Sequence, residues 1–194
     1  MCLWARLPDC RLIGVERAAA AAALARANIA ANDAGGRIEI VEASISAYIV
    51  KEPGKFQHVL INPPFHEVGR HTASPDPGKA AAHGEDSLDL DGWIGAAATA
   101  LALGGRLVLI HRADRVGTIL SAIDGRFGAA RIFPLWPCAG KEAKRILVGA
   151  IKGRRTPPRL LPGLVLHESD GRYTAAAEAV LRDAAPLDLA WTAH

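Results

Sequence analysis

Short apolar runs alternate with longer amphipathic stretches along most of the chain. Runs rich in Val, Ile and Leu are typical of strands, and apolar positions three or four residues apart are typical of helices. The predicted strands span residues 11–16, 37–42, 56–61, 106–110, 131–136 and 145–151. The predicted helices span residues 17–33, 88–103 and 114–123, with a short helix or turn over 44–50 and Asp114 as the cap of the third helix. Repeated strand–helix units predict a parallel sheet with helices on both faces.

The last two predicted strands are separated only by a loop. Because no helix intervenes between 131–136 and 145–151, these strands are predicted to be antiparallel. Residues 152–158 are rich in Gly, Pro and Arg and predict a linker. The predicted fold is therefore a doubly wound, mostly parallel α/β sheet over residues 1–155, with residues 156–194 as an appendage packed on the same domain.

Composition narrows the class of protein further. A chain of 194 residues, of which 50% are hydrophobic, can build one domain with a full core and is not typical of a disordered protein. The three cysteines lack C-x-x-C spacing, which argues against a disulfide framework or a structural zinc and favours a reducing, cytoplasmic setting. No run approaches the roughly 20 apolar residues of a membrane helix. The formal charge of +3 permits an anionic partner without requiring one.

The tetrapeptide Asn62-Pro63-Pro64-Phe65 directly follows the predicted buried strand 56–61. In an open parallel sheet, ligands bind beyond the carboxyl ends of the strands. An exocyclic amine of a nucleobase is a poor nucleophile because its lone pair is delocalised into the ring. The side-chain carbonyl of Asn62 and the main-chain carbonyl of Pro63 can accept its two hydrogens, which orients the nitrogen and favours the pyramidal form.

The remaining residues of the tetrapeptide fit the same chemistry. Two prolines stiffen the loop, so the acceptors are preorganised. Phe65 offers a flat face on which an extruded base can stack, worth about 1–3 kcal/mol. The amine would then meet a sulfonium methyl in line, with no need for a general base of unusual pKa. Alternatively, Pro-Pro only ends the strand and Phe65 belongs to the core. Its position after a buried strand favours Asn62, Pro63, Pro64 and Phe65 as catalytic residues.

Glu16 is the second candidate, at the end of the predicted strand 11–16. A carboxylate in this position can accept hydrogen bonds from both hydroxyls of a cofactor ribose. The alternative is a solvated acid near a helix N-terminus. Together with the Asn-Pro-Pro-Phe element, ribose binding is favoured.

A glycine-rich cofactor loop is expected about 20 residues before such an acid. That position precedes Met1, and no G-x-G pattern occurs near it. The hypothesis is that Met1 is a misassigned start or a truncation boundary, and that a first strand, the glycine loop and most of a first helix lie upstream. Without that strand the sheet would have two unpaired edges. A longer upstream reading frame with strand-Gly-x-Gly character is the test of this hypothesis.

The chain resembles Rossmann-like (class I) S-adenosylmethionine-dependent methyltransferases. Within them it is similar to the bacterial tRNA adenine-N6 methyltransferases that modify an anticodon-loop adenine of valine tRNA. The resemblance is carried by residues 12–16, 60–66, 104–112, 143–148, 164–167 and 170–174, and so spans nearly the whole chain. The Asn-Pro-Pro motif is specific for the chemistry, and the last two stretches indicate the subgroup.

This resemblance implies an activity and a set of site residues. It implies methyl transfer from S-adenosyl-L-methionine to adenine N6 in tRNA, by a domain that lacks its first strand. Asn62 to Phe65 are implied as catalytic and base-binding, with Asn62 also near the cofactor and Glu16 on its ribose. A contact to the cofactor adenine is implied just after strand 37–42, where the family commonly has Asp and this chain has Ser44, a weaker acceptor. Phe65 stands where relatives often carry Tyr, which preserves stacking.

Other interpretations remain open at this point. The same motif suits guanine-N2 methylation of ribosomal RNA, and related motifs methylate glutamine in release factors. A non-catalytic remnant that binds RNA or a partner is an alternative of another class. His66, His71 and His83 match no zinc spacing, so no metal is predicted, and the long segment from 66 to about 87 is a candidate substrate lid. Basic residues that could follow RNA phosphates are Lys141, Lys144, Arg145, Lys152, Arg154 and Arg155.

Overall fold

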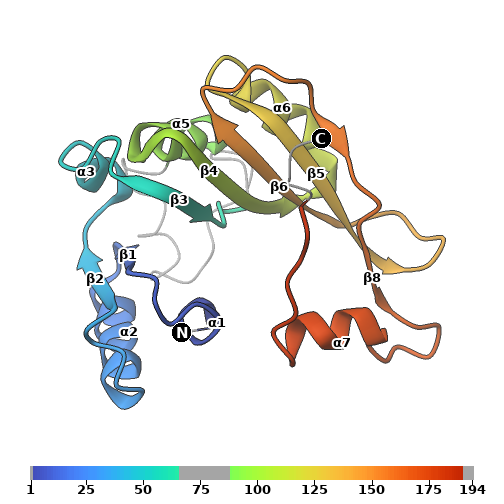
Figure 1. The fold of residues 1–194 in the computed structure, drawn as a ribbon, viewed down its shortest axis with the longest axis horizontal. Helices are drawn as coiled ribbons and strands as arrows, with labels where there is room; N and C mark the ends of the chain where they lie inside the picture. The colour runs from blue at the N-terminus through green and yellow to red at the C-terminus, as the bar shows by residue number, and fades with distance from the viewer. Residues whose placement is uncertain (1, 66–87, 190–194) are drawn as a thin grey trace, which may run out of the picture. The chain divides into compact units, whose positions relative to one another are not determined.

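The structure is a computed structural model that describes residues 2–65 and 88–189. The chain forms two compact units, residues 1–52 and 53–194, so the division falls between Glu52 and Pro53 (Figure 1). The predicted lid and its three histidines lie outside the described residues.

The first unit is a small α/β unit. Its elements are α1 (Cys2–Arg6), β1 (Leu12–Glu16), α2 (Ala19–Ala31), β2 (Ile38–Glu42) and α3 (Ile45–Ile49). β1 and β2 are parallel, and Glu16 pairs with Glu42 at their carboxyl ends. α2 is rich in alanine and buries Ala22 and Ile29. The strands and helices predicted over this part of the sequence are therefore confirmed.

The second unit contains a six-stranded sheet. Its strands are β3 (Phe56–Ile61), β4 (Leu101–Arg112), β5 (Phe127–Cys138), β6 (Arg145–Lys152), β7 (Arg159–Leu160) and β8 (Leu164–His167). Their order is β3-β4-β6-β5-β7, with β8 also beside β5. Strand β6 is antiparallel to both neighbours, β4 and β5, and the other pairings are parallel. The predicted antiparallel pair and the mostly parallel α/β fold class are confirmed.

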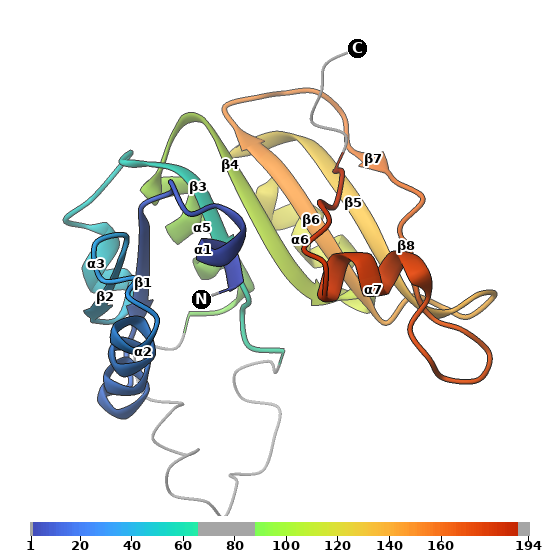
Figure 2. The same ribbon diagram turned by 60° about the horizontal axis from the view of Figure 1, so that its bottom comes forward.

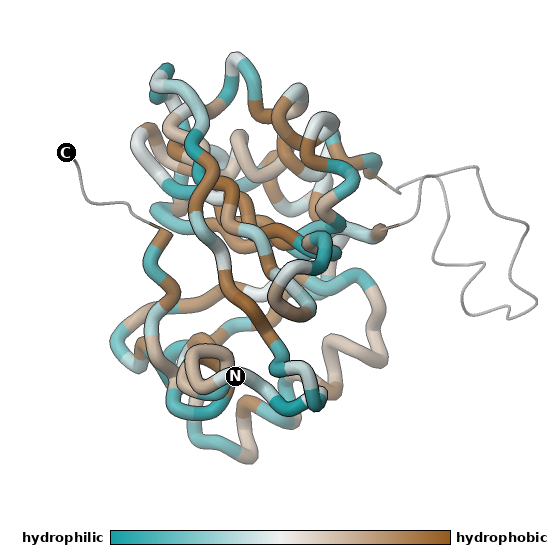
Figure 3. The backbone as a smooth tube through the Cα atoms, turned by 90° about the vertical axis from the view of Figure 1, so that its right-hand side faces the viewer, coloured by the Kyte–Doolittle hydropathy of each residue, from teal (hydrophilic) through white to brown (hydrophobic). Residues whose placement is uncertain are grey.

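Helices α5 (Leu90–Ala100) and α6 (Val116–Ile123) cover one face of this sheet (Figures 1 and 2). The largest core cluster lies between them and the strands. Its fully buried members are Ile94, Leu101, Leu107, Leu109, Ile119, Val148 and Ala150. Hydrophobic positions follow the strands of the sheet in Figure 3, as expected for strands covered by helices.

A second, smaller cluster contains alternate residues of the same strands. Phe133, Leu161 and Leu189 are buried there, with Leu135 and Leu164 packed against them. Part of this cluster comes from residues after 156, which also provide β7, β8 and α7 (Ala175–Leu181). The segment predicted as an appendage is thus paired with β5 and packed in the second unit.

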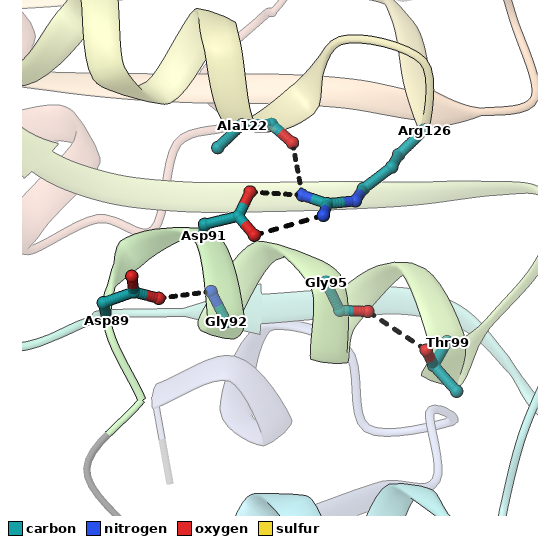
Figure 4. Close-up of polar contacts among 7 residues, drawn as sticks. All are labelled: Asp89, Asp91, Gly92, Gly95, Thr99, Ala122 and Arg126. Atoms are coloured by element: carbon teal, nitrogen blue, oxygen red, sulfur yellow. Dashed lines mark hydrogen bonds and ion pairs between the residues drawn. The ribbon is translucent and has the colours of Figure 1, made fainter.

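Polar contacts fix the N-terminal end of α5 (Figure 4). Asp89 caps the helix by accepting a hydrogen bond from the Gly92 N–H at 2.8 Å. Arg126, beyond the end of α6, donates to both carboxylate oxygens of Asp91 at 2.6 and 3.1 Å. It also donates to the main-chain oxygen of Ala122 at 2.8 Å. One guanidinium therefore joins the first turn of α5 to the end of α6.

Two sequence-based expectations are wrong. The helix predicted to reach residue 103 ends at Ala100, and β4 begins at Leu101. Apolar periodicity cannot separate a buried helix end from a buried strand start. Asp114 does not cap α6: it lies in a 3-10 turn (Ala113–Arg115), and its carboxylate accepts hydrogen bonds from Arg112 instead.

Candidate active site

The carboxyl ends of β3 and β4 meet at one edge of the sheet. The strands are parallel, with Ile61 opposite Leu109, so the residues that follow β3 lie beside the last residues of β4. In the loop after β3, Pro63 is fully buried, whereas Asn62 and Pro64 are exposed. The loop is therefore anchored by a proline and presents the Asn62 amide to solvent.

Phe65 contacts residues from two strands. Its ring makes an edge-to-face contact with His111 of β4, with centroids 5.3 Å apart and planes at 82°. The guanidinium carbon of Arg145, at the start of β6, lies 5.6 Å from the Phe65 ring centroid, a cation–π arrangement. A base that stacks on the face beneath Arg145 would have to displace that exposed side chain.

His111 is the buried polar residue of this edge. It is 3% exposed and continues the row of Leu107 and Leu109 along β4. Burial lowers the pKa of the imidazole, and a hydrogen bond to the main chain of Pro64 opposes that shift. The positive charges of Arg115 and Arg112 also lower this pKa, whereas a hydrogen bond to the main chain of Arg112 opposes the shift.

Sequence reasoning did not single out His111. Leu107, Leu109 and His111 alternate along a strand, which places the imidazole on the apolar face. The signal available was a titratable residue on a buried face, at the carboxyl end of the strand next to the one that carries Asn62.

The basic residues predicted to follow RNA phosphates fall into two places. Lys144 and Arg145 lie at the site edge, where Arg145 pairs with Arg112 of β4. Lys152 lies at the other end of β6, about 23 Å from Arg145 at about 3.3 Å per residue. Residues 154 and 155 follow it and line a separate open pocket with residues 120–130. Binding of RNA by these residues stays a prediction.

The remaining predicted residues belong to the first unit. Glu16 Oε1 accepts a hydrogen bond from the Ala18 N–H at 2.8 Å, just before α2. Ser44 follows β2 and caps α3, with its hydroxyl accepting from the Ala47 N–H at 3.2 Å. Glu16 and Ser44 thus lie at the carboxyl ends of neighbouring parallel strands. The Ala43 N–H joins the two main chains there by donating to the Glu16 main-chain oxygen at 3.1 Å.

The described residues hold no group of three or more His, Cys, Asp or Glu side chains placed for a metal ion. Within the same residues, no helix is long and apolar enough to cross a membrane. His66, His71 and His83 lie in the segment that the structure does not describe.

Residues 1–132 match the model of the methyltransferase small domain. The chain belongs to this family. The family and the fold class predicted from the sequence are confirmed, and S-adenosyl-L-methionine is the methyl donor that this membership supports. The residues at the strand ends of the first unit fit such a group: Glu16 Oε2 has no partner among the described residues, and the Ser44 hydroxyl keeps its proton for donation.

Relatives with curated names are tRNA1(Val) (adenine(37)-N6)-methyltransferases. The protein from Porphyromonas gingivalis is 34% identical over 148 residues, covering 73% of this chain and 56% of that protein. The protein from Shewanella baltica is 26% identical over 187 residues, covering 92% and 76% of the two chains. The chain therefore spans slightly more than half the length of its Porphyromonas relative.

Among solved structures, the chain resembles a predicted O-methyltransferase from Agrobacterium tumefaciens. The TM-score is 0.74 at 28% identity, and the match covers 92% of this chain and 80% of the other. The likeness extends over both units, each of which therefore has a counterpart in that structure.

Proposed function

We propose that this chain transfers a methyl group from S-adenosyl-L-methionine to adenine N6 in tRNA. The carrying observation is the Asn62–Phe65 loop at the carboxyl edge of β3, with Pro63 buried and the Asn62 amide exposed. The names of the curated relatives support adenine in tRNA as the acceptor.

In this proposal the loop acts on the amine directly. Asn62 Oδ1 and the Pro63 main-chain oxygen accept the two N–H hydrogens, which makes the nitrogen lone pair available. Phe65 stacks on the extruded base and fixes its plane. When bound, S-adenosyl-L-methionine supplies an electrophilic methyl group. As the nitrogen gained the methyl, the methyl–sulfur bond would break and leave a neutral thioether, and the positively charged nitrogen would then lose one of its protons to water.

The first unit is proposed to hold the methyl donor. Glu16 would accept hydrogen bonds from its ribose hydroxyls through Oε2, which has no partner in the described part of the chain. The Ser44 hydroxyl would contact its adenine ring while it continues to cap α3. Ser44 keeps one acceptor lone pair beyond the cap, so it can serve as either donor or acceptor.

The test measures transfer of labelled methyl from S-adenosyl-L-methionine to three acceptors: valine tRNA, ribosomal RNA and a release factor. We expect label in tRNA adenine, with Asn62→Ala lowering kcat about 100-fold because an acceptor used in the transition state is lost. Asn28→Ala is the matched control, since Asn28 lies on the exposed side of α2. This variant should keep full activity.

Other outcomes reassign the function. Label in guanine of ribosomal RNA or in glutamine of the release factor would identify a different acceptor for the same methyl-transfer reaction. A folded protein that binds tRNA but labels none of the three acceptors would favour the non-catalytic remnant. Equal activity of the Asn62→Ala and Asn28→Ala variants would remove the catalytic role of the loop.

A further inference from the structure

We propose that His111 is a positioning residue that holds the Asn62–Phe65 loop in the geometry in which its acceptors face the amine. The proposal rests on the proposed methyl transfer and adds a residue of β4 to the site. His111 is not placed in contact with substrate; it acts through Pro64 and Phe65.

The position of His111 in the sheet calls for an explanation beyond packing. Leu107 and Leu109 precede it on the same face of β4 and are fully buried, and Ile146 pairs with it on β6. A leucine at 111 would continue this apolar row. The imidazole instead buries Nδ1, which has no hydrogen-bond partner among the described residues. An unpaired buried nitrogen lowers the stability of the fold, so a compensating use of the ring is expected.

The ring contacts two consecutive residues of the loop. Main-chain hydrogen bonds to Pro64 first, and to Arg112 in smaller part, oppose the lowering of its pKa, and the ring packs against the Phe65 ring at 5.3 Å. Because Nδ1 has no partner in the described part of the chain, Nε2 is the nitrogen left to donate to the Pro64 carbonyl.

These two contacts restrain the torsions that the prolines leave free. Each proline ring locks its own φ, and the burial of Pro63 fixes the first half of the loop. The ψ angle of Pro64 and the side-chain torsions of Phe65 are not fixed by the proline rings. A bond at the Pro64 carbonyl restrains the first, and the edge contact restrains the second. Phe65 is therefore preorganised before a base arrives.

The protonation state of the ring suits this role. Burial lowers its pKa, so His111 is neutral at neutral pH and carries one N–H. That N–H is engaged by the main chain of Pro64, which leaves no proton-transfer task for the ring. The proposed reaction requires none, because the methylated amine is itself acidic.

The test compares His111→Leu with His111→Gln in the full chain. Leucine keeps the apolar row and removes the donor, whereas glutamine keeps an N–H close to the place of Nε2. We expect His111→Leu to lower kcat about 100-fold, since a loop displaced by about 1 Å can cost that much. KM for S-adenosyl-L-methionine should stay unchanged, and His111→Gln should recover most of kcat. Equal losses in both variants, or a loss in neither, would overturn the proposal.

A second readout needs no methyl acceptor. In ¹⁵N-histidine NMR spectra, the His111 signals, assigned by their absence in His111→Gln, should show a neutral ring protonated at Nε2. The Asn62 side-chain amide signals should shift or broaden in His111→Leu and stay near their wild-type positions in His111→Gln. An Nδ1-protonated ring, or Asn62 side-chain signals that stay at their wild-type positions in both variants, would contradict the positioning role. If the wild-type protein transfers no methyl group, the proposed function is wrong, and this NMR readout still decides the role of His111.

Discussion

At the scale of single residues, the candidate site combines rigid and adaptable positions. Pro63 is fully buried and cannot move without opening the core, whereas Asn62 is exposed and Arg145 lies over one face of Phe65. A base bound as proposed would therefore meet a fixed loop and one movable cation. Since Arg145 is exposed, displacing it costs little, and its charge could then contact an RNA phosphate.

The buried imidazole of His111 predicts a pH dependence of stability. Burial lowers its pKa below the ordinary value of 6.5, so the unfolded chain binds a proton there before the folded chain does. The contribution to stability is complete above pH 6.5 and is lost as the pH falls from 6.5 towards the lowered pKa. Thermal unfolding midpoints between pH 8 and pH 5 should therefore fall more for the wild type than for His111→Gln.

Other charges face the same ring and belong to that comparison. Arg112 and Arg115 lower the pKa of His111, and Asp114 lies close enough for its own pKa to be lowered by Arg112 first and by His111 in smaller part. These groups are the same in both proteins, so the difference between the two pH curves isolates His111. Equal falls in the unfolding midpoint for the wild type and His111→Gln would show that folding does not change the pKa of His111.

At the scale of elements, the start of β4 depends on a glycine pair. Gly104 has a φ of 78°, and a Cβ on Gly105 would lie 2.8 Å from the Ala102 oxygen and 3.1 Å from the Phe56 oxygen. Both obstacles are main-chain atoms, so relief would require a shift between β3 and β4. The register of these strands already changes between Phe56 and His58, at this place.

We therefore predict that Gly105→Ala destabilises the protein by about 1–3 kcal/mol, as overpacked cores do. The matched control is Gly117→Ala in α6, where nothing lies within 4 Å of the added carbon. Alanine there should stabilise the helix by about 0.5–1 kcal/mol. Urea unfolding of the two variants measures both changes, and shifts of the same sign would contradict this account.

The sequence predicted elements well where one physical signal dominates. Branched aliphatic runs located β3 and β6, and the loop between 138 and 145 indicated the antiparallel pair. The predicted boundary between helix and strand was wrong at Leu101, because Leu-Ala-Leu fits a helix and a strand equally well. The place of β6 between β4 and β5 was also not predicted, since strand order depends on contacts between distant segments.

The candidate site was predicted in the same uneven way. The Asn62–Phe65 loop carries a local signal and was identified, while its roles stay predictions. His111 has meaning only beside Pro64 and Phe65, which are more than 40 residues away along the chain. The sequence assigned Ser44 a contact with the cofactor but did not predict that Ser44 caps a helix, because only the geometry of α3 reveals that bond.

At the scale of the whole molecule, buried apolar area is unequally divided. Both core clusters belong to residues 53–194, whereas the described residues of the first unit bury only Ala22, Ile29 and Ala34. Local stability follows such burial. We predict that amide hydrogen exchange, followed by mass spectrometry, is slowest in β4 and β6 and clearly faster in β1 and β2. Equal protection in the two units would contradict this prediction.

The position of β6 has a consequence for synthesis on the ribosome. β4 and β5 are made first, yet neither pairs with the other: each pairs with β6, which comes later in the chain. Until residue 152 has emerged, their apolar faces and unpaired edges stay available to other chains. At about 5–20 residues per second, the interval from the end of β5 to the end of β6 lasts roughly one to three seconds. During that interval the nascent chain is most open to aggregation and to binding by chaperones.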